Sequence, residues 1–305
     1  MLDSSSVFPY TGVNKNGKQG VVQYKGSCRI NKIRFLVSLL IWCSASGQAD
    51  KLAFSKPKIN FEYAPSYYRY EETIFKTDEN QNEVFMTLTS VPVLHSFTCD
   101  IKRYFDYDWY NEIRTSLILG NVNYNSTSTG SASGEDNLIF TFENTINHCF
   151  KNYLCGTFGY GFRYLDNDSQ LTITSTGNFG YERENYLHFL PIGLSFERNI
   201  DFKKFSRALF QTKFYLLLDG RQVSHFSRFG CDADMNNKQN SGFGVESTAR
   251  LYANDRRWYY GAMFQYWKID ASDTVAVPCF GSSSYGSEPD NTTTMISVLM
   301  GYHYQ

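Results

Sequence analysis

A histidine, a serine and two aspartates lie close together in the last third of the chain. His225 and Ser227 are two positions apart, and Asp232 and Asp234 follow shortly after them. Residues i and i+2 of an extended segment share a face, so this imidazole could activate the hydroxyl if a third group held the ring. The nearest downstream acid on a predicted strand is Glu246. A hydrophilic surface loop accounts for the same residues, and we prefer that interpretation.

The composition argues against several classes of protein. The 305 residues carry a formal net charge of -1, and 19% of them are charged, so nothing points to nucleic acid. Aromatic residues make up 17%, with 25 Phe, 23 Tyr and 4 Trp. Membrane-spanning barrels use many aromatics in girdles at both interfaces. The mean hydropathy of -0.39 is compatible with such a barrel, because its apolar residues alternate with polar ones.

The first 49 residues read as an extension followed by an export signal. Lys32 and Arg34 precede the apolar run Phe35–Cys43, and Gly47 and Ala49 supply small residues before a cleavage point. This pattern predicts a secretory signal peptide over residues 31–49. Residues 1–30 are polar and without period, as expected if the start codon is assigned too early. The mature domain is then residues 50–305.

Ten segments of the mature domain alternate between apolar and polar residues. In the last, Met295–Tyr304, one face holds Ile296, Val298, Met300, Tyr302 and Tyr304. A period of two over about ten residues predicts a strand that can cross a bilayer at a tilt. The other nine predicted strands are Lys58–Glu72, Val91–Tyr104, Glu112–Val122, Asn137–Phe150, Tyr153–Leu165, Asn185–Glu197, Arg207–Asp219, Ser241–Ala253 and Trp258–Ile269. The phase of Trp258–Ile269 is ambiguous, because it is aromatic on both faces.

The links between these strands alternate in length. The long links are 75–90, 123–136, 166–182, 222–240 and 271–291, and the short links are 105–111, 151–152, 200–205 and 254–257. Long links at one end and short turns at the other are typical of a transmembrane barrel, with the long links outside. We therefore predict an all-β fold, a transmembrane antiparallel up-and-down β-barrel of about ten strands.

The alternation also places charged residues inside the predicted barrel. These are Glu62, Asp100, Lys102, Glu112, Arg114, Glu143, Arg163, Glu197, Arg207, Lys213, Glu246 and Arg250. Ten strands enclose little more than their own side chains, whereas porins need about sixteen for an aqueous channel. We expect a paired charge network that closes a narrow or plugged lumen, with a selectivity lining as the alternative.

The closing segment resembles the final strand of bacterial outer-membrane β-barrel proteins. The alternation from Ile296 to Tyr304 and the aromatic residue near the C-terminus carry this resemblance, although Tyr304 is penultimate and the usual terminal Phe is absent. Over Lys58–Gln305 the chain is similar to small barrels of the OmpA-like and opacity-protein type. The resemblance implies the cell outer membrane as location, outer-membrane lipid and lipopolysaccharide as partners, and the insertion machinery as a partner of Tyr302 and Tyr304.

Two further resemblances concern enzymes. Outer membrane phospholipase A and lipid A deacylase carry His-x-Ser, usually followed by Asn, and here Arg228 follows Ser227. Omptin proteases also have ten strands, with paired Asp residues and an Asp/His pair, which His225, Asp232 and Asp234 resemble in position only. We therefore expect a non-enzymatic membrane anchor that displays surface loops, for adhesion, surface interaction or envelope integrity. A small porin or channel and an outer-membrane hydrolase are the alternatives.

The mature domain contains five cysteines, which leaves one over if the rest pair. Cys231 and Cys279 fall in two long links on the same side, and Cys149 and Cys155 flank one short turn, so two disulfides are possible. Cys99 is then the odd residue, and five free thiols are the alternative. No spacing of Cys and His suggests a metal, and no cofactor is expected.

Overall fold

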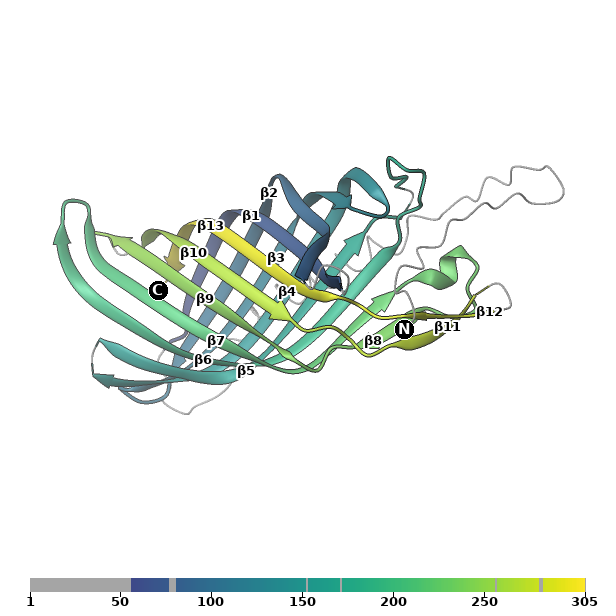
Figure 1. Ribbon diagram of the computed structural model, residues 1–305. Helices are drawn as coiled ribbons and strands as arrows, with labels where there is room; N and C mark the ends of the chain where they lie inside the picture. Colours follow the sequence, from purple (N-terminus) through teal and green to yellow (C-terminus); the bar gives the residue numbers. More distant parts are fainter. Residues whose placement is uncertain are drawn as a thin grey trace. The chain divides into compact units, whose positions relative to one another are not determined.

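Alternating apolar and polar residues form the closed antiparallel barrel of ten strands that the sequence predicts (Figure 1). The computed structural model describes residues 56–76, 81–151, 153–170, 172–255, 257–279 and 282–304. These residues belong to one compact unit, Ser55–Gln305. The predicted extension and signal peptide, residues 1–49, lie outside the described residues.

The barrel strands follow one another round the ring in nearly sequential order. Their bounds are β1 Lys58–Lys76, β2 Gln81–Tyr104, β3 Trp109–Ser126, β4 Gly130–Lys151, β5 Leu154–Asp168, β6 Glu182–Phe202, β7 Phe205–Ser224, β9 Gly242–Ala253, β10 Trp258–Ile269 and β13 Asp290–Tyr304. Strand β6 pairs with β7, and β1 pairs with β13 in a register that sets Ile59 opposite Tyr304 and Tyr67 opposite Ile296. The first and last strands therefore close the ring.

The strands extend further than the apolar pattern predicts, and they do so at the long-link end. Strand β2 begins at Gln81 rather than Val91, and β3 and β4 pair as far as Ser126 opposite Gly130. The backbone ladder continues into the predicted links, where inward residues of β2 such as Met86 and Leu88 are buried. Most of residues 125–134, within the predicted link 123–136, are strand.

Smaller elements lie at the long-link end. They are the 3₁₀ helix η1 Phe226–Phe229, β8 Met235–Lys238, which pairs with β7, and the hairpin of β11 Val275–Cys279 and β12 Ser282–Gly286. Met235, Val277 and Cys279 are buried together, with Phe226 packed against them. We call the described parts of residues 225–241 and 270–289 the cap. Among the described residues, no helix has the length and apolar character needed to cross a membrane.

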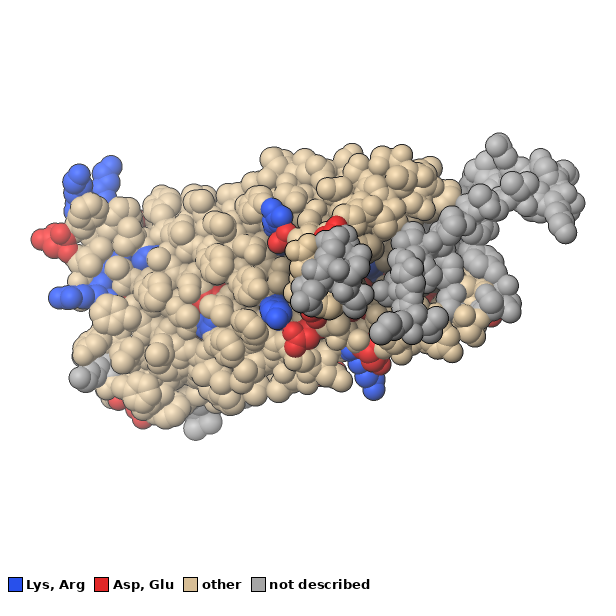
Figure 2. All heavy atoms as spheres, in the orientation of Figure 1, with Lys and Arg blue, Asp and Glu red and all other residues tan. Residues whose placement is uncertain are grey.

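The outward face of the barrel carries an apolar belt. Exposed large apolar residues on it include Phe61, Phe97, Phe158, Leu194, Phe210, Phe214, Tyr260, Phe264, Ile296 and Val298. On the face drawn in Figure 2, charged residues are sparse over the middle of the barrel and gather towards its ends. The ion pair Arg69–Glu71 follows Tyr67 on the same face of β1 and marks the border of the belt towards the long links. A continuous apolar surface of this kind is typical of contact with lipid.

The inward face is filled by side chains. The rings of Phe189, Tyr215 and Trp267 pack with centroid separations of 4.9, 5.2 and 5.0 Å, and all three residues are essentially buried. Phe189 fits because its neighbour is Gly161, where an added Cβ would lie 2.1 Å from the Phe189 ring. The absence of a side chain at Gly161 on the inner face of β5 thus admits a large neighbour.

For two strands, the three-dimensional structure is needed to tell which side chains face inward. Strand β10 turns Tyr259 and Trp267 inward and Trp258 and Tyr260 outward, which resolves the ambiguity in its sequence. A β-bulge between β6 and β7 inserts one residue of β7 between Leu217 and Asp219. The alternation that places Lys213 in the lumen predicts the same for Asp219; this prediction is wrong, because the extra residue reverses the alternation and leaves Asp219 exposed.

Candidate functional site

The twelve charged residues predicted for the lumen lie on the inward face of the strands. Arg114 of β3 is at the centre of the set. It lies 3.0 Å from Glu246, 3.6 Å from Asp100 and 3.7 Å from Glu62, and Arg250 donates to Glu62 over 2.9 Å. These contacts join β1, β2, β3 and β9, so they span the interior as well as linking neighbours.

Three further ion pairs complete the set. Lys213 lies 2.6 Å from Glu143, which also accepts a hydrogen bond of 3.0 Å from the Tyr215 hydroxyl. Towards the short-link end, Lys102 lies 3.6 Å from Glu112, and Arg207 lies 3.1 Å from Glu197. We call these eleven paired residues the lumen network; the twelfth residue, Arg163, is not part of it. The network holds six acids and five bases, and because every one of them has a partner of opposite charge it has little capacity for a charged ligand.

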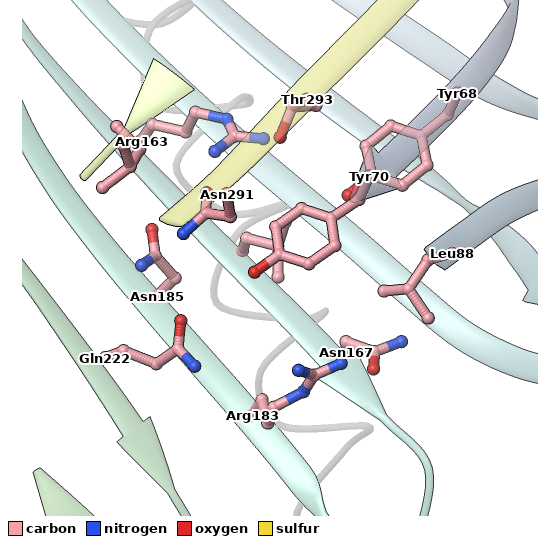
Figure 3. A pocket seen from close by; sticks show the side chains of 12 residues that line it. Tyr68, Tyr70, Leu88, Arg163, Asn167, Arg183, Asn185, Gln222, Asn291 and Thr293 are labelled. Atoms are coloured by element: carbon pink, nitrogen blue, oxygen red, sulfur yellow. The ribbon is translucent and has the colours of Figure 1, made fainter. Parts of the chain in front are cut away.

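A small cavity lies on the long-link side of the lumen network (Figure 3). Its volume is about 20 Å³, which is room for about one water molecule. Its polar lining comes from β1, β5, β6, β7 and β13 and comprises Tyr68, Tyr70, Arg163, Asn167, Arg183, Asn185, Gln222, Asn291 and Thr293. Arg183 is paired with Glu72 at 2.8 Å.

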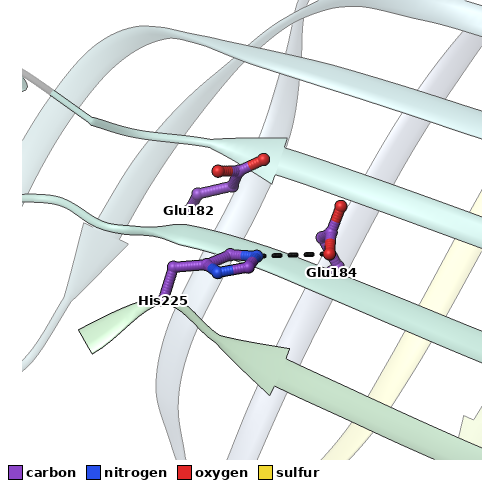
Figure 4. A group of neighbouring side chains, drawn as sticks. All are labelled: Glu182, Glu184 and His225. Carbon is purple, nitrogen blue, oxygen red and sulfur yellow. Dashed lines mark hydrogen bonds and ion pairs between the residues drawn. The ribbon is translucent and has the colours of Figure 1, made fainter. Parts of the chain in front are cut away.

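A second cluster of polar side chains lies on the outward face at the long-link end. It comprises Glu182, Glu184, His225 and Asp234, and we call it the rim cluster (Figure 4 draws the first three). Glu182 and Glu184 share a face of β6, because they are two positions apart. The chain leaving β7 brings His225 beside them, and its backbone N–H donates to the Glu182 carbonyl over 3.0 Å.

Both ring nitrogens of His225 face carboxylates. Nε2 lies 3.2 Å from Glu184 Oε2, and Nδ1 lies 2.9 Å from Asp234 Oδ2. Asp234 also accepts the backbone N–H of Ser227 over 2.9 Å. Burial alone would raise the pKa of Asp234, but its hydrogen bonds with Ser227 and His225 hold the pKa below the ordinary value. An ionised Asp234 therefore fixes the orientation of the imidazole.

The rim cluster has the donor set of a divalent-cation site. One ligand atom each from Glu182, Glu184 and His225 lies within 4.8 Å of the others. Imidazole and carboxylate are ligands of zinc, and an acid behind the histidine is the usual second partner. Arg228 and Gln170 already bond to Glu182, so a cation would have to share that carboxylate.

The structure does not bring the predicted hydrolase residues together as a catalytic set. Ser227 bonds to Asp234 rather than to His225, and Glu246 lies in the lumen network beside Arg114. Asp232 donates its backbone N–H to the Pro278 carbonyl, and no contact of the described residues joins it to His225. Among the predicted residues that the structure describes, the side chains of His225 and Ser227 both bond to Asp234, and neither is joined to the other.

No sequence pattern predicts the acids that complete the rim cluster. Glu182 and Glu184 fall at the end of a predicted link and just before a predicted strand, and His225 lies about forty positions away. An alternating pair of acids beside an aromatic-rich strand is the only local sign, and it is common on surfaces. The pairing of β6 with β7 is needed to see that the three residues meet.

Two disulfides fix the links. Cys231 is bonded to Cys279, joining the segment after η1 to the end of β11, and Cys149 is bonded to Cys155 across a short turn. Cys99 is buried and takes part in neither of these bonds. The first disulfide holds the two halves of the cap together at the long-link end.

Glu288 ties the cap to the mouth of the barrel. It is buried and accepts a hydrogen bond of 3.1 Å from Ser224 at the end of β7. Burial, and next the like charge of Glu72, raise its pKa to about 7, although Arg183 acts in the opposite direction. The Glu288 carboxyl group of the cap therefore gains or loses its proton near neutral pH.

Comparison with known proteins assigns no family. No protein-family model and no curated protein matches the sequence. The translocator domain of the autotransporter NalP from Neisseria meningitidis is 11% identical, over 90% of this chain and 96% of that chain, with a TM-score of 0.35. An outer-membrane channel from Pseudomonas putida F1 is 9% identical, over 85% and 98%, with a TM-score of 0.35. A mutant of the monoaromatic hydrocarbon channel TodX is 7% identical, over 80% and 90%, with a TM-score of 0.29. At TM-scores of this size, none of these likenesses gives the chain a family, ligand or activity, and the OmpA-like and opacity type stays a prediction.

Proposed function

We propose that this chain is an integral outer-membrane barrel with a closed lumen, which anchors a disulfide-clamped cap at the cell surface. The filled interior carries this proposal. Ion pairs join opposite walls at the level of Arg114, and the rings of Phe189, Tyr215 and Trp267 form a layer nearer the long-link end. An aqueous path would have to displace both, and barrels of about this size are normally filled.

The apolar belt supports residence in a membrane. Leu194 is 58% exposed and Val298 is 66% exposed, and both lie in the belt rather than at its borders. Exposing such residues to water is unfavourable, whereas lipid accepts them. Outer-membrane lipid and lipopolysaccharide are the proposed surroundings, with the long links facing out of the cell.

The display role is supported by the way the cap is fixed. A disulfide, a shared apolar cluster and the extension of β7 by β8 hold it over one end of the barrel. A surface held in a single shape suits recognition of another molecule, because less conformational entropy is lost on binding. Host or surface ligands are the proposed class of partner.

Planar-bilayer recording of the refolded protein tests the closed lumen. We expect no conductance steps from the unmodified protein. The triple variant Phe189→Ala, Tyr215→Ala, Trp267→Ala should conduct if the aromatic layer is a barrier. The matched variant Phe210→Ala, Phe214→Ala, Leu216→Ala changes the lipid face and should stay silent. Discrete steps from the unmodified protein would support the channel alternative.

Epitope insertion tests the orientation. A tag after Gly177 lies in the β5–β6 link, where an added Cβ would meet no atom within 4 Å, and should be labelled on intact cells. A tag between Lys203 and Lys204 lies in a short link and should be labelled only after permeabilisation. The opposite result would place the cap in the periplasm and remove the display role.

A contact with the insertion machinery is proposed for the closing strand. Tyr302 packs edge-on against Trp258 with ring centroids 5.0 Å apart, and Tyr304 is 60% exposed. The variant Tyr304→Ala should lower the amount assembled in cells while leaving refolding in detergent unchanged. Equal losses in both assays would indicate a role in stability alone.

A further inference from the structure

Arg163 differs from the other charged residues of the lumen. Its side chain projects inward from β5 and is 4% exposed. Among the described residues, no acid lies within ion-pair distance of its guanidinium, and Nε and Nη2 have no hydrogen-bond partner. Its guanidinium carbon lies 5.7 Å from the centroid of the Trp267 ring. Arg163 is therefore a buried cation with no counter-charge in the described structure.

The cavity beside Arg163 is electrically unbalanced. Twelve residues line it, among them two arginines and no carboxylate. The charge of Arg183 is balanced by Glu72, whereas that of Arg163 is not. In Figure 3 the Arg163 guanidinium lies next to Thr293 at one side of the cavity, with the Tyr70 ring further across. Hydroxyl and amide groups around it can donate further hydrogen bonds.

Burying an unpaired charge is costly, and arginine cannot escape the cost by losing its proton. We propose that this cavity binds one small monovalent anion of halide size, chloride under ordinary conditions, with the Arg163 N–H groups as its principal donors. A volume of about 20 Å³ admits a single water-sized species and excludes phosphate, sulfate and organic acids. The proposal concerns a site inside the barrel and goes beyond the display role of the cap.

Unfolding of the refolded full chain at constant ionic strength tests the site. Melting temperature is measured in sodium chloride, sodium bromide and sodium gluconate. We expect the two halides to raise the melting temperature above that in gluconate. A halide at tenfold its dissociation constant would multiply the folded-to-unfolded ratio by about eleven. Identical melting in all three salts would overturn the proposal and leave water as the occupant.

Two variants separate this site from general salt effects. Arg163→Met should abolish the difference between halide and gluconate, and in gluconate it should be at least as stable as the unmodified protein. Arg221→Met removes an exposed arginine of β7 that bonds to Asn236, and should keep the full difference. Retention of the halide effect in Arg163→Met would overturn the proposal.

Direct detection covers the case in which Arg163→Met does not fold. Crystals of the unmodified protein grown in bromide should show an anomalous peak within hydrogen-bond distance of Arg163 Nε or Nη2. Peaks confined to the protein surface would overturn the proposal. The outcome is independent of the conductance assay, because a closed barrel and an open one can both hold a bound halide.

Discussion

The lumen network and the long-link end hold their charges in opposite ways. In the network, Arg114 contacts three acids and Lys213 is paired with Glu143, so charges of opposite sign meet. At the long-link end, acids also lie beside acids: Glu288 lies near Glu72, the partner of Arg183, and Glu182, the partner of Arg228, lies beside Glu184. The comparison indicates that the network serves closure, whereas the long-link end retains capacity for a proton, a cation or a partner.

The largest expected effect comes from breaking the network at its centre. Arg114→Met leaves Glu62, Asp100 and Glu246 with less compensation, and we expect a loss of roughly 3–5 kcal/mol in the free energy of unfolding. Urea unfolding in detergent micelles measures it. Arg198→Met, which removes an exposed arginine of β6, is the control and should change stability by less than about 0.5 kcal/mol. A loss from Arg114→Met as small as the control would mean that the network does not stabilise the closed barrel.

Loss of the disulfides should have the next largest effect on stability. The disulfide at the long-link end should contribute more than the one at the short-link end. Cys231 and Cys279 are 48 positions apart, and Cys149 and Cys155 are 6 apart. From the entropy of the unfolded chain, replacing the first pair by serine should cost about 4 kcal/mol and the second about 2 kcal/mol. The same urea unfolding measures both. Equal costs would indicate that strain in the folded state, rather than loop length, dominates.

Arginine substitutions at lipid-facing positions test the barrel from its outer side. Leu194→Arg and Val298→Arg should each cost roughly 2–4 kcal/mol near the bilayer midplane, because the charge must enter lipid. Refolding into lipid vesicles with urea titration measures this cost. Ser195→Arg points into the lumen, where Ser195 is 7% exposed, and should fail by crowding instead. Equal tolerance of arginine at positions 194 and 195 would contradict the assigned phase of β6.

The last effect concerns Glu288 and depends on pH, and it is the smallest when expressed per pH unit. The ordinary pKa of this carboxyl group is 4.5, and in the folded protein it is about 7. Between pH 4.5 and pH 7 the carboxyl group is therefore protonated in the folded state and ionised in the unfolded state. Stability from this group is complete below pH 4.5 and is lost as the pH rises through 7, by at most about 1.4 kcal/mol per unit. Glu288→Gln should flatten that part of the stability profile. An unchanged slope in the variant would assign the titration to another group.

The sequence predicts the belt well, because one physical constraint acts on every residue of it. Lipid outside and a packed interior impose period two, so the inward or outward side of residues such as Leu194 and Val298 follows from the pattern. The pattern fails where that constraint is absent. A bulge moves Asp219 outward, and β10 needs aromatic residues on both faces because Tyr259 and Trp267 fill the lumen.

The candidate sites are less accessible to sequence reasoning. The twelve lumen charges follow from alternation, but which charges meet depends on contacts across the ring, such as that of Glu62 with Arg250. The isolation of Arg163 cannot be read from its type or spacing. The rim cluster depends on where β6 and β7 end, and strand ends beyond the belt carry no hydrophobic signal.

Closure of the ring between β1 and β13 has a consequence for how the protein folds. The Glu62–Arg250 pair joins residues 188 positions apart and the Arg114–Glu246 pair joins residues 132 apart, so neither contact is available to the emerging N-terminal half. A partly formed sheet would leave Glu62 and Asp100 to share Arg114, without Arg250 or Glu246. Incomplete assemblies are therefore electrostatically disfavoured, and the energy gained at the final seam acts as a check that all ten strands are present and in register.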